Sequence, residues 1–432
     1  MSKWEIRDFS NIISLMESGL RPKGGVSVDS GEIPSFGGEN IIQSGGVSYN
    51  NLNKVPTKFF EMMKKGILKD KDVLINKDGA NTGKVGLFNN SRFQRACINE
   101  HLFLIRGKEE VIIQDYIYYF LLSPKAQQII KTKISGSAQP GLNTKFIENF
   151  PITFPLDKSI QTRIAEILST ADKAIENSEK LIAKYKRMKN GLMQDLLTKG
   201  IDENGNIRSE ATHKFKDSPI GRIPVEWKVD VFGKYSYIKG RIGWRGLKSD
   251  EYKEEGPYLI AGNHIIDCKV VWDACQHINL YRYNESPEIQ LQLDDIIISK
   301  DGTIGRVAYV DFLPGLATIN STMMLLRITN KEIYNRFIFY YLQGEYFSNI
   351  IKEKTSGSGV PHLFQRDMKS LLLPIIDFQE QNNIANMLIS LDNQIINEII
   401  ALSKLKRLKT GLMNDLLSGK VGVEGIEEVN NE

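Results

Sequence analysis

The chain has 432 residues, of which 41% are hydrophobic and 25% are charged, a composition typical of globular proteins. It is long enough for more than one domain, and its net charge of +4 is too small to establish binding to a polyanion. Three cysteines, no apolar leader and no apolar run of membrane-spanning length argue against secreted and membrane classes, so we expect a soluble cytoplasmic protein.

Residues 1–155 are predicted to form a globular α+β domain. Short β-type runs alternate with Gly and Asn turns, and the run at 72–76 is followed by Asp78-Gly79, which is typical of a hairpin turn. An aromatic-rich stretch at 115–130 is predicted to be a helix.

Residues 156–199 are predicted to form one long helix, because Pro and Gly become rare and apolar residues recur at steps of three and four. A helix of about 40 residues would be roughly 60 Å long. The positions in this seam are Ile164, Leu168, Ala171, Ile175, Ser178, Ile182, Tyr185, Met188, Leu192 and Leu196.

The rest of the chain follows the same order. Residues 200–224 are polar and Gly-rich and are predicted to be a crossover linker, and 225–374 form a second α+β domain. Residues 375–420 form a second long helix, with a seam that includes Leu388, Leu391, Ile395 and Leu408, and 421–432 form a flexible tail.

Ordered sequence matches at a nearly constant spacing identify a tandem duplication. The matches are Trp4-Glu-Ile with Trp227-Lys-Val, Asp72-Val-Leu-Ile-Asn-Lys-Asp-Gly79 with Asp295-Ile-Ile-Ile-Ser-Lys-Asp-Gly302, Ala96-Cys-Ile-Asn99 with Ala317-Thr-Ile-Asn320, and Ser135-Gly-Ser137 with Ser356-Gly-Ser358. Since both copies contain a long helix with an apolar seam, we expect the two helices to pair as an antiparallel coiled coil between two globular domains.

Several motifs resemble the specificity subunits of type I restriction-modification enzymes, and the resemblance spans essentially the whole chain. They are Lys216-Asp-Ser-Pro-Ile-Gly-Arg-Ile-Pro-Val-Glu-Trp227, the helix ends Gly191-Leu-Met-Gln-Asp-Leu-Leu197 and Gly411-Leu-Met-Asn-Asp-Leu-Leu417, and the helix entries at 155–164 and 374–384. The first copy departs from this pattern, because it lacks the Gly-x-Ile-Pro lead that precedes Trp227.

The resemblance implies that each α+β domain is a target-recognition domain that reads half of a bipartite site on double-stranded DNA. It implies that the helices set the gap between the half-sites and dock two methyltransferase subunits, with restriction subunits completing the complex. It also implies a non-catalytic chain without a cofactor, because S-adenosylmethionine, ATP and magnesium would be bound by the partner subunits.

Basic residues shared by the two copies are candidates for phosphate contacts, which carry no sequence information. Lysines beside a flexible Gly loop with hydroxyl groups suit such a contact, although a solvated helix end gives the same pattern. The candidates are Lys77, Lys131, Lys133, Ser135 and Ser137 in the first copy and Lys300, Lys352, Lys354, Ser356 and Ser358 in the second.

Residues in the unlike stretches are candidates for base contacts, because arginine can bind guanine and asparagine or glutamine can bind adenine. The candidates are Arg21, Lys23, Asn40, Gln43, Asn50 and Asn51 in the first copy and Arg241, Arg245, Lys248, Asn263 and His264 in the second. Cations near the helix ends are candidates for contacts to a partner or to the DNA backbone, or form a solvated face: Lys186, Arg187, Lys189, Lys406, Arg407 and Lys409.

The sequence favours neither an enzyme nor a metal protein. Residues 79–85 resemble a P-loop but have too short a spacing and a valine where Ser or Thr is needed. A zinc site from His264, Cys268, Cys275 and His277 would lack the Cys-x-x-Cys knuckle, so we expect no metal. A coiled-coil adaptor that binds only proteins is the main alternative function.

Overall fold

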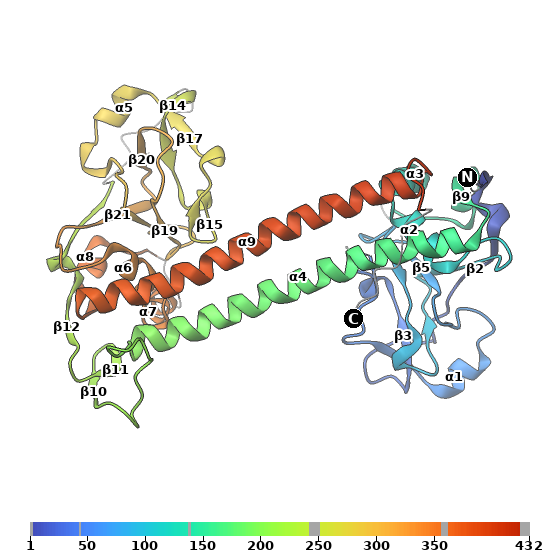
Figure 1. The fold of residues 1–432 in the computed structure, drawn as a ribbon, viewed down its shortest axis with the longest axis horizontal. Helices are drawn as coiled ribbons and strands as arrows, with labels where there is room; N and C mark the ends of the chain where they lie inside the picture. The colour runs from blue at the N-terminus through green and yellow to red at the C-terminus, as the bar shows by residue number, and fades with distance from the viewer. Residues whose placement is uncertain (1–2, 43–44, 137–139, 242–250, 356–361, 424–432) are drawn as a thin grey trace. The chain divides into compact units, whose positions relative to one another are not determined.

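The chain forms two compact units, and each combines a globular domain with parts of both long helices (Figure 1). Unit 1 consists of residues 1–180 and 399–432, and unit 2 consists of residues 181–398. The computed structural model describes residues 3–42, 45–136, 140–241, 251–355 and 362–423.

The globular part of unit 1 is built on one antiparallel sheet of order β2-β8-β5-β6, a smaller sheet of order β4-β3-β7, and the antiparallel pair β1-β9. These strands are β1 (Trp4–Asp8), β2 (Ile13–Ser18), β3 (Ile33–Phe36), β4 (Asn53–Val55), β5 (Val73–Asn76), β6 (Val85–Leu87), β7 (Cys97–Ile98), β8 (Leu102–Gly107) and β9 (Pro151–Pro155). Helix α1 (Thr57–Met62) follows β4, and α2 (Gln114–Leu122) and α3 (Pro124–Lys133) follow β8.

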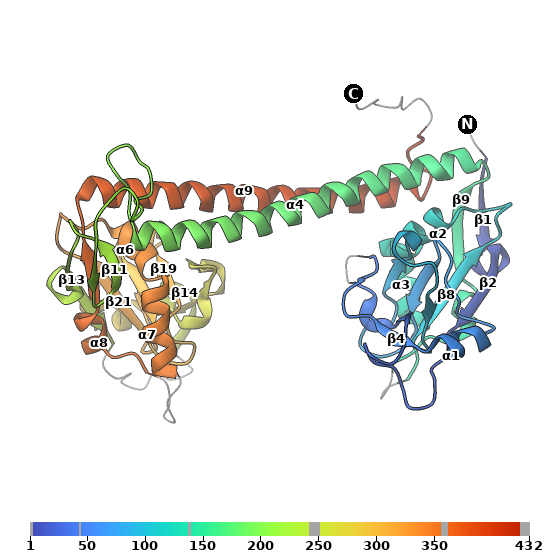
Figure 2. The same cartoon turned by 90° about the horizontal axis from the view of Figure 1, so that it is seen from below.

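The globular part of unit 2 has the same strand order, which confirms the internal repeat and the α+β class. Its sheets are β13-β21-β18-β19, β17-β14-β20 and β12-β22. These strands are β12 (Lys228–Val231), β13 (Ser236–Gly240), β14 (Tyr252–Ile260), β17 (Gln276–Ile278), β18 (Ile296–Ser299), β19 (Val307–Tyr309), β20 (Ala317–Ile319), β21 (Met323–Ile328) and β22 (Leu372–Ile375). The helices are α5 (Leu280–Asn284), α6 (Asn335–Tyr341), α7 (Glu345–Thr355) and α8 (Gln365–Ser370) (Figure 2).

Strands β5 and β18 are buried along their whole length, because each lies between two cores. In β18, Ile296 and Ile298 face the core that contains α6, while Ile297 faces a second core under β20. Such strands are continuous apolar runs rather than alternating ones. This explains why the two runs are so alike in sequence.

Buried ion pairs follow the same repeat. The Asp72 carboxylate accepts two bonds of 2.7 Å from Arg106, and the Asp295 carboxylate accepts two of 2.7 Å from Arg327. The Asp72 and Asp295 side chains are only 2% and 0% exposed. Each pair joins the loop before the central strand to the neighbouring strand.

The long helices are α4 (Lys158–Thr198) and α9 (Phe378–Leu416), close to the predicted ranges. Asp157 and Asp377 accept backbone bonds of 2.8 Å from Ser159 and Gln379, and these bonds satisfy amides of the first turn. Hydrogen bonds from the Ser159 hydroxyl and from its amide hold the pKa of the Asp157 carboxyl below the ordinary value. Within the described residues, neither these helices nor any other is long and apolar enough to span a membrane.

A buried glutamine fixes the start of each long helix to its domain. Gln161 Nε2 donates to Pro155 O and Val111 O, and Gln161 Oε1 accepts from the Ile113 amide, over 2.8–3.0 Å. Gln381 makes the same three bonds in unit 2 with Ile376 O, Glu332 O and the Tyr334 amide. Both side chains are therefore fully bonded although they are almost wholly buried.

In each unit one residue triad joins the domain to both helices. In unit 1, Tyr119 of α2 donates to Asp172 of α4 over 2.9 Å, and Lys409 of α9 pairs with the same carboxylate over 2.5 Å. In unit 2, Tyr340 of α6 donates to Asp392 of α9 and Lys189 of α4 pairs with it, both over 2.7 Å. Lys189 and Lys409 are only 17% and 12% exposed, so they do not form a solvated face, and their availability to a partner or to the DNA backbone is not supported.

Within each unit, α4 and α9 are antiparallel. In unit 1, Asp172 of α4 pairs with Lys409 of α9, and Glu179 pairs with Lys406 over 2.7 Å. Later positions on α4 therefore meet earlier positions on α9. The seam prediction is correct for Ile175, Ser178, Leu391 and Ile395, which are buried. It is wrong for Met188 and Leu408, which are 47% and 57% exposed.

The predicted linker contains ordered structure. Strands β10 (Phe215–Ser218) and β11 (Gly221–Pro224) form an antiparallel hairpin. The Arg208 guanidinium, 10% exposed, pairs with Glu380 at the start of α9 and with Glu226. Gly200 ends α4 with a φ of 62°, and a Cβ there would lie 2.4 Å from the Trp227 ring and 2.2 Å from Glu380, so only glycine fits.

Candidate nucleic-acid interface

In unit 1 the structure brings together the two shared motifs that the sequence places far apart. The Leu142 amide donates to Lys77 O over 2.7 Å, and the Gly79 amide donates to Pro140 O over 3.1 Å. The turn after β5 therefore lies against the loop that follows α3. Lys131 and Lys133 stand in the last turn of α3, at the start of that loop.

Unit 2 repeats this arrangement. The Leu363 amide donates to Lys300 O over 3.0 Å, and Asp301 forms a backbone bridge with His362. Lys352 and Lys354 stand in the last turn of α7. Each unit therefore presents one cluster, which we call the turn site: the Lys-Asp-Gly turn and the loop after the neighbouring helix.

The lysines of the turn sites differ in accessibility. Lys131 and Lys352 are exposed, and Ser135 is exposed beside them. Lys133 Nζ donates to Glu148 O over 3.1 Å, and Lys354 pairs with Asp367 over 3.0 Å at the edge of α8. These cations remain at the surface and could meet a phosphate.

Lys77 and Lys300 are held more tightly. Lys77 Nζ donates to Glu100 O over 2.9 Å, and the Lys300 side chain, 15% exposed, lies 3.6 Å from Asp301. Ser137, Ser356 and Ser358 lie outside the described residues.

Each turn site also holds an aspartate–histidine pair that the sequence did not single out. His101 Nδ1 lies 2.6 Å from Asp78 Oδ1, and His362 Nδ1 makes a short hydrogen bond to Asp301 Oδ1. The chain has only five histidines, and two of them contact aspartates at equivalent positions of the two copies. A comparison of the folded copies reveals this match. The histidines come from different loops, so sequence alignment of the copies could not find them.

Two predicted base-contact residues are corrected by the structure. Asn40 and His264 are 3% and 4% exposed, and each closes a short 3-10 turn by accepting a backbone bond. Asn40 Oδ1 accepts from the Gly37 amide over 2.8 Å, and His264 Nδ1 accepts from the Ala261 amide over 3.1 Å. Burial also lowers the pKa of His264, which keeps its ring neutral. Buried side chains bonded to their own backbone are not available to a base.

The exposed residues of these turns are Glu39 and Asn263. Asn263 therefore remains a candidate, and Glu39, which the sequence analysis missed, is its counterpart in unit 1. A carboxylate can accept a bond from cytosine N4. Glu39 Oε1 already accepts a bond of 3.0 Å from Asn53.

The other base-contact candidates divide into exposed, buried and undescribed residues. Lys23, Asn50 and Asn51 are exposed, and Arg21, about half exposed, lies 3.5 Å from Glu100 beside the turn site. Arg241 is 6% exposed and lies 3.6 Å from Glu285, so its availability to a base is not supported. Gln43, Arg245 and Lys248 lie outside the described residues.

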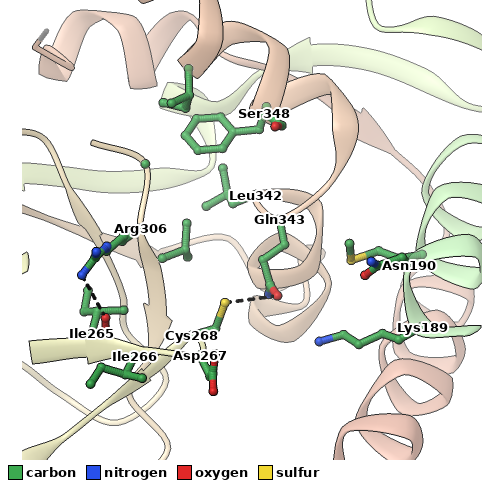
Figure 3. A pocket seen from close by; sticks show the side chains of 15 residues that line it. Lys189, Asn190, Ile265, Ile266, Asp267, Cys268, Arg306, Leu342, Gln343 and Ser348 are labelled. Atoms are coloured by element: carbon green, nitrogen blue, oxygen red, sulfur yellow. Dashed lines mark hydrogen bonds between the residues drawn. The ribbon is translucent and has the colours of Figure 1, made fainter. Parts of the chain in front are cut away.

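Unit 2 contains a cavity of about 650 Å³ between the end of α4, the hairpin of β15 (Ile265–Ile266) and β16 (Lys269–Val270), and helices α6 and α7 (Figure 3). Several of its polar lining groups bond to the protein. Cys268 Sγ donates to Gln343 Oε1 over 3.4 Å, and Arg306 donates to Ile265 O over 3.4 Å. We therefore assign no ligand to this cavity.

Cys97, Cys268 and Cys275 are free thiols, and Cys97 and Cys275 are buried. Burial raises the pKa of Cys275 to about 11, which disfavours the thiolate that a metal requires. In the part of the chain that the structure describes, no three His, Cys, Asp or Glu side chains are grouped so that they could hold a metal ion.

Comparison with known proteins gives consistent matches. The family model of the type I restriction modification DNA specificity domain matches residues 1–187 and 247–404. The chain is 28% identical over 429 residues to a putative type I restriction enzyme MjaX specificity subunit of Methanocaldococcus jannaschii, covering 98% of this chain and 94% of the relative. It is 25% identical over 377 residues to the MjaVIII specificity subunit of the same organism, covering 86% and 84%.

Two solved structures share the fold. The S subunit of a type I restriction-modification system from M. genitalium matches with a TM-score of 0.60 and 18% identity over 96% of both chains. A chain from a study of complex assembly and conformational transition of the type I R-M system matches with a TM-score of 0.58 and 14% identity, over 97% of this chain and 98% of that one. At these identities the structural likeness supports the fold alone.

Proposed function

Because the chain belongs to the specificity-subunit family of type I restriction-modification systems, we propose that it recognises a bipartite site on double-stranded DNA and docks the other subunits there. The observation that carries this proposal is the repeated turn site. Both units present a lysine cluster of the same construction, while the loops around it differ between the copies. Shared cations suit phosphates and unlike loops suit different bases.

We propose that the paired helices act as a spacer between the two recognition domains. A helix of the length of α4 or α9 is about 60 Å long, and each helix begins in one unit and ends in the other. The triads and the buried glutamines support this role, because they fix each domain to its helix segments without a flexible joint.

Exposed and half-buried apolar residues of the helices support docking of partner subunits. In unit 2, Met188, Leu192 and Met387 line a shallow groove on α4 and α9, and in unit 1, Ile399 and Leu402 line a second one. We propose that two methyltransferase subunits bind these helices and that restriction subunits join them. In this proposal the chain itself is non-catalytic, and S-adenosylmethionine, ATP and magnesium are bound by those partners.

Exchange of residues 225–374 for the same domain of another specificity subunit should change one half of the recognised site and leave the other half unchanged. Each unit has its own cores and its own turn site, so the halves are read independently. The donor must carry a tyrosine equivalent to Tyr340, so that the triad with Asp392 and Lys189 is kept. Mapping of N6-methyladenine in DNA modified by the whole complex gives the result.

The reciprocal exchange of residues 1–155 is the matched control and should change only the other half. If either exchange alters both halves, independent recognition is wrong. If the complex methylates without any preferred sequence, the chain is an adaptor that binds proteins only.

Replacement of Lys131, Lys133, Lys352 and Lys354 by glutamine should weaken binding to duplex DNA of every sequence. Each lost phosphate contact lowers the slope of log affinity against log salt by about 0.9, so the loss should approach about 3 to 4 for the set. Fluorescence anisotropy with a random-sequence duplex measures both quantities.

The matched control replaces four other exposed lysines, Lys3, Lys180, Lys199 and Lys228, and removes the same net charge. An equal loss of slope in both sets would show that the turn sites make no specific contact with phosphates.

A further inference from the structure

The turn sites of the two units contain the same interaction built from different parts. The aspartate is shared, since Asp78 and Asp301 occupy equivalent positions after β5 and β18. The histidines are not shared: His101 follows β7 and precedes β8, whereas His362 lies in the loop between α7 and α8. The duplication therefore does not explain why both aspartates contact a histidine. Both turn sites must instead need a histidine at this position for the same reason.

The histidines are not needed to hold the loops of the turn sites together, because backbone hydrogen bonds already join these loops. Lys77 accepts from the Leu142 amide and its own amide donates to His101 O over 2.8 Å. Lys300 accepts from the Leu363 amide and its amide donates to Thr322 O over 2.8 Å. Thr322 stands where unit 1 has His101, and it keeps this loop in place without a histidine.

In each ring only Nδ1 contacts the shared aspartate, and the second nitrogen is Nε2. When Nδ1–H donates to the aspartate, Nε2 lies on the far side of the ring. The His101 and His362 side chains are 45% and 29% exposed, so part of each ring reaches the surface within its turn site. His101 Nε2 has one further neighbour, Glu100 Oε1 at 3.5 Å.

Charged groups of both signs lie around each ring. Around His101 these are Asp78 and Glu100, with Lys77 at 4.0 Å from Asp78 and Arg21 at 3.5 Å from Glu100. Protonation of the ring therefore adds a positive charge to a cluster in which acids and bases are otherwise equal in number.

Around His362 the charged groups are Asp301 and, at 3.6 Å from it, Lys300. The Phe364 ring packs against His362 with 4.2 Å between the ring centroids, and the Arg366 guanidinium lies 4.7 Å from the Phe364 centroid. Histidine is the side chain whose ordinary charge change falls between about pH 5 and pH 8.

We propose that His101 and His362 bind DNA phosphates through Nε2, each oriented by the shared aspartate, so that DNA affinity rises as the histidines become protonated. This inference rests on the proposed DNA-binding function. Asp78 and Asp301 are positioning residues in it, since they act on the DNA only through the ring.

The test measures binding of a labelled random-sequence duplex to the full chain in complex with its methyltransferase partner, at several pH values and salt concentrations. From about pH 8 to about pH 5.5, affinity should rise and the salt slope should steepen by up to about 2, one phosphate contact for each histidine. The double variant His101→Asn, His362→Asn keeps a donor near the Nδ1 position but cannot titrate, and it should show neither change. His213→Asn, which alters a half-buried histidine of the linker, is the matched control and should behave like the unchanged protein.

A double variant that keeps the full pH-dependent gain would overturn the inference while leaving the proposed function intact. Failure of the unchanged complex to bind DNA at any pH would instead contradict the proposed function. The histidine variant could also lose binding at pH 8, where no charge difference from asparagine is expected. In that case the double variant Asp78→Asn, Asp301→Asn tests the inference instead. It should move the midpoint of the pH dependence to lower pH, and an unchanged midpoint would contradict the positioning role.

Discussion

Replacement of Asp295 by alanine should destabilise unit 2 by about 3 kcal/mol, at the low end of the range for breaking a buried ion pair. The Asp295 carboxylate is wholly buried and accepts two bonds from Arg327 and one of 2.7 Å from the Gln292 amide. Its loss leaves a guanidinium that is only 25% exposed without its counter-charge. Because about 1.4 kcal/mol is a factor of ten, amides of β18 and β21 that exchange by unfolding of unit 2 should exchange with solvent about a hundredfold faster.

The matched control is Asp273→Ala, an exposed aspartate of the same unit, which should change stability by less than about 0.5 kcal/mol. Asp72→Ala should have the same effect on β5 and β8 of unit 1 as Asp295→Ala has on unit 2, because Asp72 makes equivalent bonds to Arg106 and to the Lys69 amide. If Asp295→Ala is as mild as Asp273→Ala, the ion pair does not hold the sheet together.

The duplication made most of the fold predictable. Two copies of one sequence pattern are expected to fold alike, so their matched runs indicate matched strands and helices. The helix ranges came close because Asp157 and Asp377 act as caps just before the apolar periodicity begins. The hairpin β10–β11 was missed, because its strands are too short and polar to show a pattern.

The candidate site was predictable only where the copies agree. The shared lysines and the Lys-Asp-Gly turns were found from sequence, and the structure brings them together. In the loops that differ between the copies, the sequence does not distinguish a polar residue that contacts DNA from one that bonds to its own backbone. Asn40 and His264 are of the second kind, and only their burial reveals it.

Pairs that are distant in sequence could not be inferred from one chain. Lys189 and Lys409 resemble surface cations of a helix, and their contacts with Asp392 and Asp172 depend on the antiparallel register of α4 and α9. The partners of Asp78 and Asp301 depend on which loops meet at the turn sites. Such contacts are set by tertiary packing, which local periodicity does not encode.

Insertion of one heptad into both long helices should lengthen the gap that the protein tolerates by about three base pairs. Seven helical residues add about 10 Å and keep the same helix face toward the partner, and base pairs are spaced about 3.4 Å apart. The insertions belong after Ile182 in α4 and after Ile399 in α9, because these positions lie between the triad residues Asp172 and Lys189 on α4 and Asp392 and Lys409 on α9. Both triads can then form unchanged. Selection from duplexes that carry the two half-sites at varied separations measures the preferred gap.

The DNA helix limits how well the longer protein can bind. Three base pairs also turn the duplex by about 100°, whereas a heptad leaves the helix face nearly unrotated, so the new optimum should be weaker than the original one. A heptad in α4 alone is the matched control. It cannot satisfy both the Asp172–Lys409 and the Lys189–Asp392 pairs, so we expect lower stability and weak binding at either separation. If the variant with both insertions still prefers the original gap, the separation is set by the domains themselves and the helices are not the spacer.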